Sequence, residues 1–151
     1  GDEPGYGNIT GGKHTYFKEK LEREGFSITV FDSAAGWEGA LTRYDASIRE
    51  HDLVIYFCAV ATKSNQTTVR IEWAQPMGAN CPIYIPVIPT IFISMENPYH
   101  LLDVPMIKTY INGYTNTKEM IDAIVDKLMG RAGFEGDSPV DAFCGRWDTH
   151  L

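Results

Sequence analysis

The sequence predicts a single α/β domain built around a mostly parallel β-sheet. A chain of 151 residues with 44% hydrophobic side chains can bury one sizeable core and fits one domain better than two. Two apolar runs, Leu53–Val60 and Thr90–Met95, are continuous rather than alternating, as expected of strands covered on both faces. Segments of helical periodicity alternate with the expected strands, and this order favours a parallel sheet with helices on both faces.

The first part of the chain is expected to alternate helices and strands. Helical spacing of His14, Phe17 and Leu21 predicts a helix over His14–Glu24, which Gly25 ends as a C′ glycine. A strand follows over Phe26–Phe31. A second helix is expected at about Trp37–Glu50, because one helical face carries four large side chains, Trp37, Leu41, Tyr44 and Ile48.

After the central strand Leu53–Val60, regular structure is harder to assign. Val69–Ile88 contains Pro76, Pro82 and Pro86, which forbid one long helix, so an irregular segment with short helical turns at most is expected. Ile107–Ile111 is expected to form another strand.

The chain then returns to a helix that Asn116 begins and Gly130 ends. Asn116 is followed three residues later by Glu119, a capping-box-like start. Four apolar residues line the expected buried face: Ile121, Ile124, Val125 and Leu128. Gly133–Leu151 shows no period, so a surface tail pinned by Phe143 and Trp147 is expected.

Residues 89–103, reading PTIFISMENPYHLLD, place polar groups directly after a buried strand. Glu96-Asn97-Pro98 stops the strand, and Pro98 suits the first turn of a short helix. Open α/β sheets bind ligands at the carboxyl ends of their strands, so Asn97, Tyr99 and His100 are candidates to contact a ligand. A purely structural role for these residues is favoured over ligand contact, because Asn-Pro commonly initiates a turn and Tyr99 fits the edge of a core.

Composition excludes several classes of function. The net charge of −7, from 13 basic and 20 acidic residues that are scattered, argues against nucleic-acid binding and against docking on an anionic membrane. No apolar run is long enough to span a bilayer, and the amino end does not resemble a signal peptide. Localisation stays undecided, with cytoplasmic favoured over secreted.

Metal and cofactor sites are not expected either. The cysteines and histidines lack metal-site spacing: Cys58, Cys81 and Cys144, and His14, His51, His100 and His150. The glycines of Tyr6–Lys13 do not match a phosphate-binding loop, so no nucleotide or flavin is expected.

The order of elements lacks a first strand. A flavodoxin-like three-layer sandwich has strand order 2-1-3-4-5, so its first strand is central. Here the glycine-rich segment Gly1–Gly12 stands where the loop after such a strand would be. An apolar gap between the strands at Phe26–Phe31 and Leu53–Val60 would result. We therefore expect this chain to be part of a larger protein, with self-association through exposed strand edges as an option.

Five motifs stand in order along the chain: DLVIYFCAV (Asp52–Val60), SNQTTVRIEWAQPMG (Ser64–Gly78), PTIFISMENPYHLLDVP (Pro89–Pro105), TYINGY (Thr109–Tyr114) and SPVDAFCGRWD (Ser138–Asp148). Together they resemble the C-terminal α/β domain of family 3 glycoside hydrolases, most closely the β-N-acetylhexosaminidase-like branch. The resemblance implies a flavodoxin-like domain packed against an N-terminal (β/α)8 barrel that carries the aspartate nucleophile.

The resemblance also sets expectations for catalysis. In the β-glucosidase branch, the loop after the strand equivalent to LVIYFCAV carries a glutamate acid/base, whereas Ala61–Thr68 (ATKSNQTT) has no carboxylate. This departure favours the hexosaminidase-like branch, whose acid/base residues lie on the barrel. No catalytic residue is therefore expected in this chain, and the chain alone is expected to be inactive.

Residues near the sugar are expected after the central strand. Asn65, Gln66 and Arg70 could hydrogen-bond sugar hydroxyls, because amides and guanidinium groups offer fixed donors. Equally, Asn65 and Gln66 could form a turn while Arg70 pairs with an acidic neighbour such as Glu72.

Several other side chains are candidates by residue type only. The acids are Glu96, Asp103 and Asp141, and the sugar-stacking aromatics are Trp37 and Trp73, although packing is the commoner role for such aromatics. The function expected from the resemblance is that of an accessory domain completing a sugar site. The alternative is a free-standing flavodoxin-like module that binds a small ligand or a protein.

Overall fold

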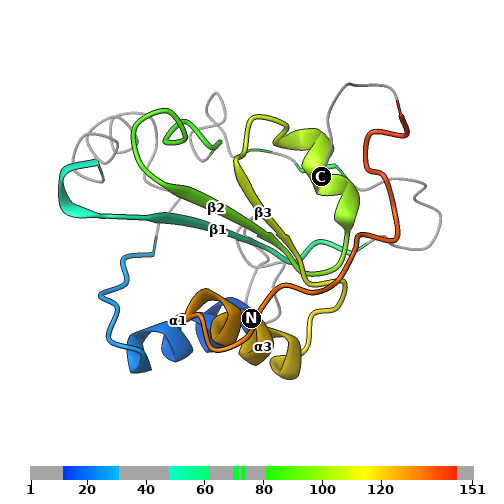
Figure 1. Ribbon diagram of the computed structural model, residues 1–151. Coiled ribbons are helices and arrows are strands. Elements are labelled where there is room, and N and C mark those ends of the chain that lie inside the picture. Colours follow the sequence, from blue (N-terminus) through cyan, green and yellow to red (C-terminus); the bar gives the residue numbers. More distant parts are fainter. Residues whose placement is uncertain (1–11, 31–47, 62–69, 72, 74–80, 146–151) are drawn as a thin grey trace, which may run out of the picture.

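A parallel three-stranded sheet with helices packed on it forms the part of the chain that the structure describes (Figure 1). The structure is a computed structural model and describes residues 12–30, 48–61, 70, 71, 73 and 81–145. In chain order its elements are α1 (Lys13–Arg23), β1 (Val54–Cys58), β2 (Thr90–Ser94), the 3₁₀ helix η2 (Pro98–Asp103), β3 (Thr109–Asn112) and α3 (Lys118–Leu128). The predicted α/β class with a parallel sheet is confirmed.

The sheet has the order β1-β2-β3, and each strand is parallel to its neighbour. Its register aligns Cys58, Ser94 and Asn112 across the carboxyl ends of the strands. Because side chains alternate along a strand and aligned residues share a face, these three side chains leave the same side of the sheet. The register thus sets one row of polar side chains at the end where parallel sheets bind ligands.

One face of the sheet is covered by α1 and α3. Both helices lie along the lower side of the sheet in Figure 1 and contribute buried apolar side chains, Phe17 and Leu21 from α1 and Ile121, Ile124 and Val125 from α3. Phe17 stacks on Phe57 of β1, with ring centroids 4.9 Å apart. Burial of each large side chain stabilises the fold by roughly 1.5–3 kcal/mol. The two helices therefore pack on one face of the sheet and enclose the main core with it.

The ends of both helices follow from local sequence. Gly25, with φ of 95°, follows α1, and Gly130, with φ of 71°, follows α3, so both predicted terminal glycines are confirmed. The start of α3 differs by one residue from the prediction. Thr117 rather than Asn116 is the N-cap, and its hydroxyl oxygen accepts a hydrogen bond from the Met120 amide at 3.2 Å.

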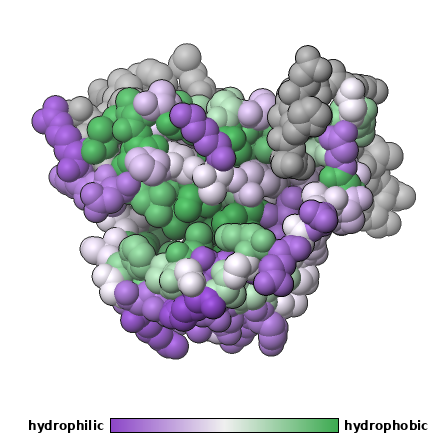
Figure 2. Space-filling model, in the orientation of Figure 1, coloured by the Kyte–Doolittle hydropathy of each residue, from purple (hydrophilic) through white to green (hydrophobic). Residues whose placement is uncertain are grey.

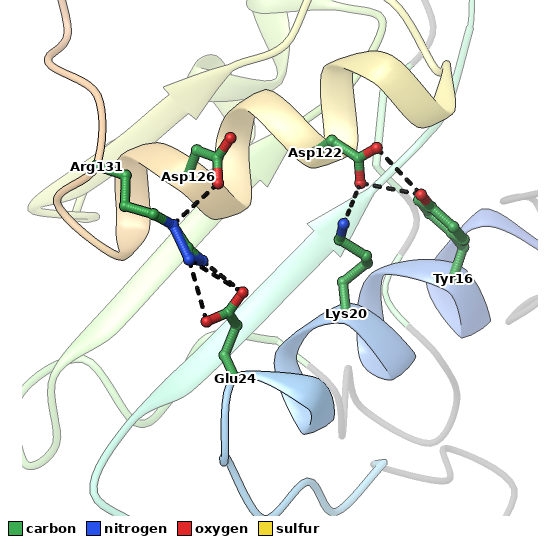
Figure 3. A network of polar contacts seen from close by, with 6 residues as sticks. All are labelled: Tyr16, Lys20, Glu24, Asp122, Asp126 and Arg131. Atoms are coloured by element: carbon green, nitrogen blue, oxygen red, sulfur yellow. Dashed lines mark hydrogen bonds and ion pairs between the residues drawn. The ribbon is translucent and has the colours of Figure 1, made fainter.

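A polar clamp joins the exposed sides of the two helices (Figure 3). Asp122 of α3 accepts a hydrogen bond from the Tyr16 hydroxyl at 2.9 Å and contacts the Lys20 ammonium at 2.9 Å. The hydrogen bond from Lys20 holds the pKa of Asp122 below its usual value. Asp122 thus ties one turn of α3 to two successive turns of α1.

Arg131, just after α3, forms the other half of this clamp (Figure 3). Its guanidinium Nη1 donates to both carboxylate oxygens of Glu24 at 3.2 Å, and its Nε donates to Asp126 at 3.1 Å. Such bidentate pairing fixes the geometry better than a single ion pair. The end of α1 is thereby held against the end of α3.

The opposite face of the sheet carries a row of aromatic rings. Tyr56, Phe92 and Tyr110 lie at one register level, and their centroids are 6.1 and 5.5 Å apart. The Tyr110 hydroxyl donates to the Pro98 carbonyl at 3.2 Å and so attaches β3 to η2. Burial raises the pKa of both tyrosines, which keeps their hydroxyls protonated.

The carboxyl-terminal segment packs beside η2, as predicted for Phe143. Leu101, Ala142 and Phe143 form a second small core cluster. The Asp141 carboxylate accepts hydrogen bonds from the Phe143 amide at 2.9 Å and the Gly145 amide at 2.6 Å. Trp147, the other predicted anchor, lies outside the described residues.

Several predicted elements differ in the structure. The predicted strand Phe26–Phe31 was wrong for its described residues, because 26–30 are not strand. A strand requires a hydrogen-bonded neighbour, and among the described residues none pairs with this segment. Its Ile28 packs on the main core, while Phe26 and Val30 are 44% and 60% exposed.

The other differences concern boundaries. The strand predicted at Ile107–Ile111 runs over Thr109–Asn112 instead, because the Ile107 amide donates to the Val104 carbonyl in a turn. The strand predicted at Leu53–Val60 is shorter, at Val54–Cys58. Of the helix predicted at Trp37–Glu50, only 48–50 are described, and these are helical. The described residues 81–88 form turns, as predicted for this part of Val69–Ile88.

Candidate functional site

The carboxyl ends of β1 and β2 meet the short helix η2, and this meeting point forms the candidate site. The strand β2 stops at Ser94, and the Asn97 side chain accepts a hydrogen bond from the Tyr99 amide at 3.0 Å. Pro98 occupies the first helical turn, where its fixed φ and missing donor are tolerated. The predicted strand, polar turn and helix start are therefore confirmed, and Asn97 forms the turn that was predicted as its alternative role.

His100 of η2 lies over the polar row at the strand ends and is fully buried. The Ser94 hydroxyl donates its single proton to the Asn97 carbonyl at 2.7 Å. At 2.9 Å from the same hydroxyl, His100 Nδ1 must therefore be the donor. The Cys58 sulfur lies 3.6 Å from Nδ1. This hydrogen-bond chain assigns the imidazole to the tautomer that carries its proton on Nδ1.

The other ring nitrogen of His100, Nε2, is buried with no hydrogen-bond partner among the described residues. Burial lowers the pKa of His100 below its ordinary value of 6.5, and the negative charge of Asp103 opposes this shift only in part. A proton on Nε2 would be a buried donor without an acceptor, so the neutral ring is the stable form.

Cys58, Ser94 and His100 do not form a nucleophile with its base. A histidine that activates a serine or cysteine accepts the proton of the nucleophile. Here the hydrogen bonds have the opposite direction: His100 donates to Ser94, and Ser94 donates to a backbone carbonyl. Burial also raises the pKa of the Cys58 thiol to about 12, which keeps the sulfur protonated and weakly nucleophilic. This cluster therefore fixes η2 on the sheet rather than performing chemistry.

Arg70 and Asp103 join the segment after β1 to η2. The Arg70 Nε and Nη2 both contact Asp103 Oδ1, the former at 2.5 Å, and the Ile71 amide donates to Asp103 Oδ2 at 3.1 Å. The Asp103 side chain is only 7% exposed, whereas that of Arg70 is 59% exposed. The buried carboxylate thus holds one edge of the guanidinium and leaves the other edge in solvent. Arg70 does pair with an acid, but the partner is Asp103, and Glu72 lies outside the described residues.

Four of the six predicted sugar-proximal residues are described, and they gather at this end of the sheet. Tyr99, 42% exposed, and His100, fully buried, lie on η2 itself. Asn97 is the N-cap of this helix, and Arg70 pairs with its last residue, Asp103. Asn65 and Gln66 lie outside the described residues. The sequence reading did not identify Ser94 as the partner of His100. The register of β2 and the position of Ser94 as its last residue are the signals that could have identified it.

Three of the candidates named by residue type, Asp103, Asp141 and Trp73, have structural roles. Asp141 accepts hydrogen bonds from the amides of Phe143 and Gly145, and Asp103 accepts one from the Arg70 guanidinium. Trp73 packs edge-on against Tyr56, with centroids 6.3 Å apart, which is the packing role. Trp37 lies outside the described residues.

A depression of about 500 Å³ lies at the opposite, amino-terminal end of the strands. Its lining is mainly apolar and includes Leu53, Val87, Ile91 and Lys108. Because parallel sheets place ligands at the other end, and because few polar groups converge here, the carboxyl end remains the candidate site.

The described ranges contain neither a metal-binding cluster nor a helix suited to a membrane. No three histidine, cysteine or carboxylate side chains of the described residues gather closely enough to hold a metal ion. None of the helices in the described part of the chain has the length and apolar character needed to cross a bilayer.

Comparison with known proteins identifies longer relatives. No family model matches the chain. A β-N-acetylglucosaminidase/β-glucosidase of Cellulomonas fimi is 50% identical over 135 residues, which are 89% of this chain and 24% of that protein. The solved structure of the β-glucoside phosphorylase BglX matches with a TM-score of 0.70 and 39% identity, over 90% of this chain and 24% of that chain.

A second structure of BglX, bound to 2FGlc, matches with the same TM-score of 0.70 and 39% identity, over 88% of this chain and 23% of that chain. This chain therefore spans about a quarter of the length of the relatives that it matches. The predicted resemblance to one domain of a larger enzyme is confirmed.

Proposed function

Because the chain belongs with the C-terminal α/β domains of family 3 glycoside hydrolases, we propose that it is the accessory domain of a larger sugar-processing enzyme. Residues 1–151 form one domain of that enzyme, and a (β/α)8 barrel is its partner. The names of the relatives indicate the substrate class, a β-linked glucoside or N-acetylglucosaminide.

The proposed role of the domain is to complete and shield the sugar site. The observation that carries this role is the Arg70–Asp103 pair, which fixes a guanidinium edge at the carboxyl end of the sheet and exposes its other edge. Guanidinium N–H groups are rigid donors that suit sugar hydroxyls. Tyr99, 42% exposed on the same short helix, adds an aromatic face and a hydroxyl.

In this proposal the barrel performs the bond cleavage. Retaining glycosidases use two groups on opposite sides of the glycosidic bond, usually carboxyls about 5–5.5 Å apart. The direction of the hydrogen bonds through Ser94 and His100 supports a structural role for this cluster. The domain then contributes binding and water exclusion, which raise the rate by positioning the substrate and by strengthening electrostatic interactions in the closed site.

A nuclear magnetic resonance titration tests this proposal. Isotope-labelled chain is titrated with glucose and with N-acetylglucosamine, and amide shifts are followed. We expect the shifts to centre on Arg70 and Tyr99, and to be lost in Arg70→Ala. The matched control is Arg131→Ala, which removes a guanidinium 45% exposed on the far helical layer and should leave the titration unchanged.

Two results would contradict the proposal. Shifts centred on the depression near Lys108 and Thr109 would place the ligand at the opposite end of the sheet and favour a free-standing binding module. Equal titration of the wild-type chain and Arg70→Ala would remove Arg70 from the sugar site.

A further inference from the structure

Tyr114 is the first residue beyond the sheet at the carboxyl end of β3. The Gly113 amide donates to the Ser94 carbonyl at 2.7 Å, so the contact of β3 with β2 extends to Gly113. A Cβ on Gly113 would lie only 3.1 Å from Met95 Sδ, so this glycine packs closely on the core. Tyr114 therefore begins the loop to α3 at the end of the strands where parallel sheets bind ligands.

The backbone of Tyr114 has a conformation that is unusual for a tyrosine. Its φ of 59° lies in the left-handed region, which glycine and asparagine adopt more readily than residues with bulky side chains. The side chain is 44% exposed, so its burial offsets little of this cost. Residues kept in such conformations are concentrated at ligand sites, where the surrounding structure holds them. Neither burial nor backbone preference therefore favours a tyrosine at this position.

The hydrogen bonds of the Tyr114 hydroxyl have a fixed direction. Tyr114 Oη lies 3.1 Å from Ser138 Oγ, and the Ser138 hydroxyl donates to the Val140 carbonyl at 2.7 Å. A serine hydroxyl has a single proton, so Tyr114 must be the donor to Ser138. With its own proton engaged, the Tyr114 oxygen can only accept further hydrogen bonds. A ligand group that meets this oxygen must therefore be a donor.

Two sets of contacts hold Tyr114 near η2. The Tyr110 hydroxyl, which donates to the Pro98 carbonyl of η2, is one of them. Burial raises the pKa of Tyr110, and Tyr114 lies close enough to add to this rise. The other is the carboxyl-terminal segment, which receives the hydrogen bond from Tyr114 and packs Phe143 against Leu101 of η2. Tyr114 thus belongs to the same end of the sheet as the exposed groups assigned above to the sugar site.

On the basis of the accessory role proposed above, we propose that Tyr114 is a further residue of the sugar site and that its oxygen accepts a hydrogen bond from one sugar hydroxyl. Arg70 can only donate hydrogen bonds, so an acceptor nearby complements it. A sugar hydroxyl donates and accepts at once, and a fixed acceptor discriminates against a ligand that lacks the donor. Tyr114 therefore adds specificity for a hydroxyl at one position of a β-linked glucoside or N-acetylglucosaminide.

A nuclear magnetic resonance titration with methyl β-glucoside tests the role of the hydroxyl. Tyr114→Phe removes the hydroxyl and keeps the ring, and we expect the dissociation constant to rise about two- to tenfold, as for the loss of one neutral hydrogen bond. The matched control is Tyr16→Phe, which removes a tyrosine hydroxyl that likewise donates a hydrogen bond, to Asp122. Tyr16 lies on the far helical layer, whose outer rim is hydrophilic in Figure 2, and its replacement should leave the dissociation constant unchanged.

Two further measurements separate sugar contact from a purely structural role. Among the monodeoxy analogues of methyl β-glucoside, one should bind wild type about two- to tenfold more weakly than the parent sugar, and Tyr114→Phe should bind both equally. Tyr114→Gly should weaken sugar binding without lowering the urea midpoint of unfolding, because glycine adopts the left-handed backbone without steric cost.

Three results would overturn the role of Tyr114. Equal dissociation constants for wild type and Tyr114→Phe, with binding still lost in Arg70→Ala, would exclude Tyr114 and leave the accessory role intact. A lower urea midpoint for Tyr114→Gly together with unchanged sugar binding would assign the tyrosine to folding alone. Absence of any titration of the wild-type chain would overturn the proposed sugar site and the role of Tyr114 with it.

Discussion

Removal of Arg70 is expected to destabilise the fold more than the loss of an ordinary surface ion pair would. Arg70→Ala leaves the Asp103 carboxylate, 7% exposed, with only the Ile71 amide as a donor among the described residues. An exposed ion pair contributes about 0–1 kcal/mol, and a hydrogen bond to a charged group contributes about 1.5–3 kcal/mol. Since Arg70 itself is 59% exposed, an intermediate loss of about 1–2 kcal/mol in the free energy of unfolding is expected.

A double-mutant cycle isolates the interaction between the two side chains. Urea unfolding of wild type, Arg70→Ala, Asp103→Ala and the double variant, followed by circular dichroism, gives the coupling energy. We expect about 1 kcal/mol. The control cycle is Lys18 with Glu22 on α1, where both side chains are more than a third exposed, at 34% and 40%, and where about 0.3–0.5 kcal/mol is expected. A coupling for Arg70 and Asp103 no larger than that of the control would refute the reasoning.

Two further predictions concern stability. Burial holds the pKa of His100 below 6.5, so the unfolded state binds the proton more readily than the folded state does. The free energy of unfolding should therefore be highest above pH 6.5 and fall as the pH falls through that value. Urea unfolding at a series of pH values measures this, and the same dependence on pH in wild type and His100→Gln would contradict it. Gly113→Ala would place a Cβ 3.1 Å from Met95 Sδ and 3.3 Å from Met120 Cγ, so a loss of about 1–3 kcal/mol in the free energy of unfolding is expected. The control Gly133→Ala, whose nearest atom lies at 3.9 Å, should be nearly neutral. Equal unfolding midpoints for the two variants would show that the two methionines move aside without cost.

The sequence predicted the strands that are buried and the helices that are amphipathic. Thr90–Met95 and Leu53–Val60 were recognisable because short, continuous apolar runs of this length are typical of covered strands. Glycine at the left-handed positions after α1 and α3 marked the helix ends, since few other residues adopt that backbone. The start of α3 was displaced by one residue because Asn116 and Thr117 are both good caps.

That residues 26–30 do not form a strand could not be predicted from the residues of this segment alone. Its composition favours a strand, but a strand forms only beside a partner, and none of the described residues pairs with this segment. Local propensity therefore indicates the potential of the segment, and the hydrogen-bonded neighbour decides its state.

The candidate site shows the same division between local and long-range information. Asn97, Tyr99 and His100 were found because they follow a strand directly. The pairing of Arg70 with Asp103, and of His100 with Ser94, depends on which strand ends lie side by side. Residue type alone also suggested Asp103 as an acid, whereas its contacts assign it to holding Arg70.

The most direct test of the accessory role is an activity measurement on the purified chain. Aryl N-acetyl-β-glucosaminide and aryl β-glucoside are offered as substrates, each with and without inorganic phosphate, and release of the aryl group is compared with a buffer blank. An accessory domain whose barrel partner performs the chemistry predicts no release above the blank under any of these conditions. Turnover by the chain alone, lost when Arg70 or His100 is replaced, would contradict the accessory role and place catalysis in this domain.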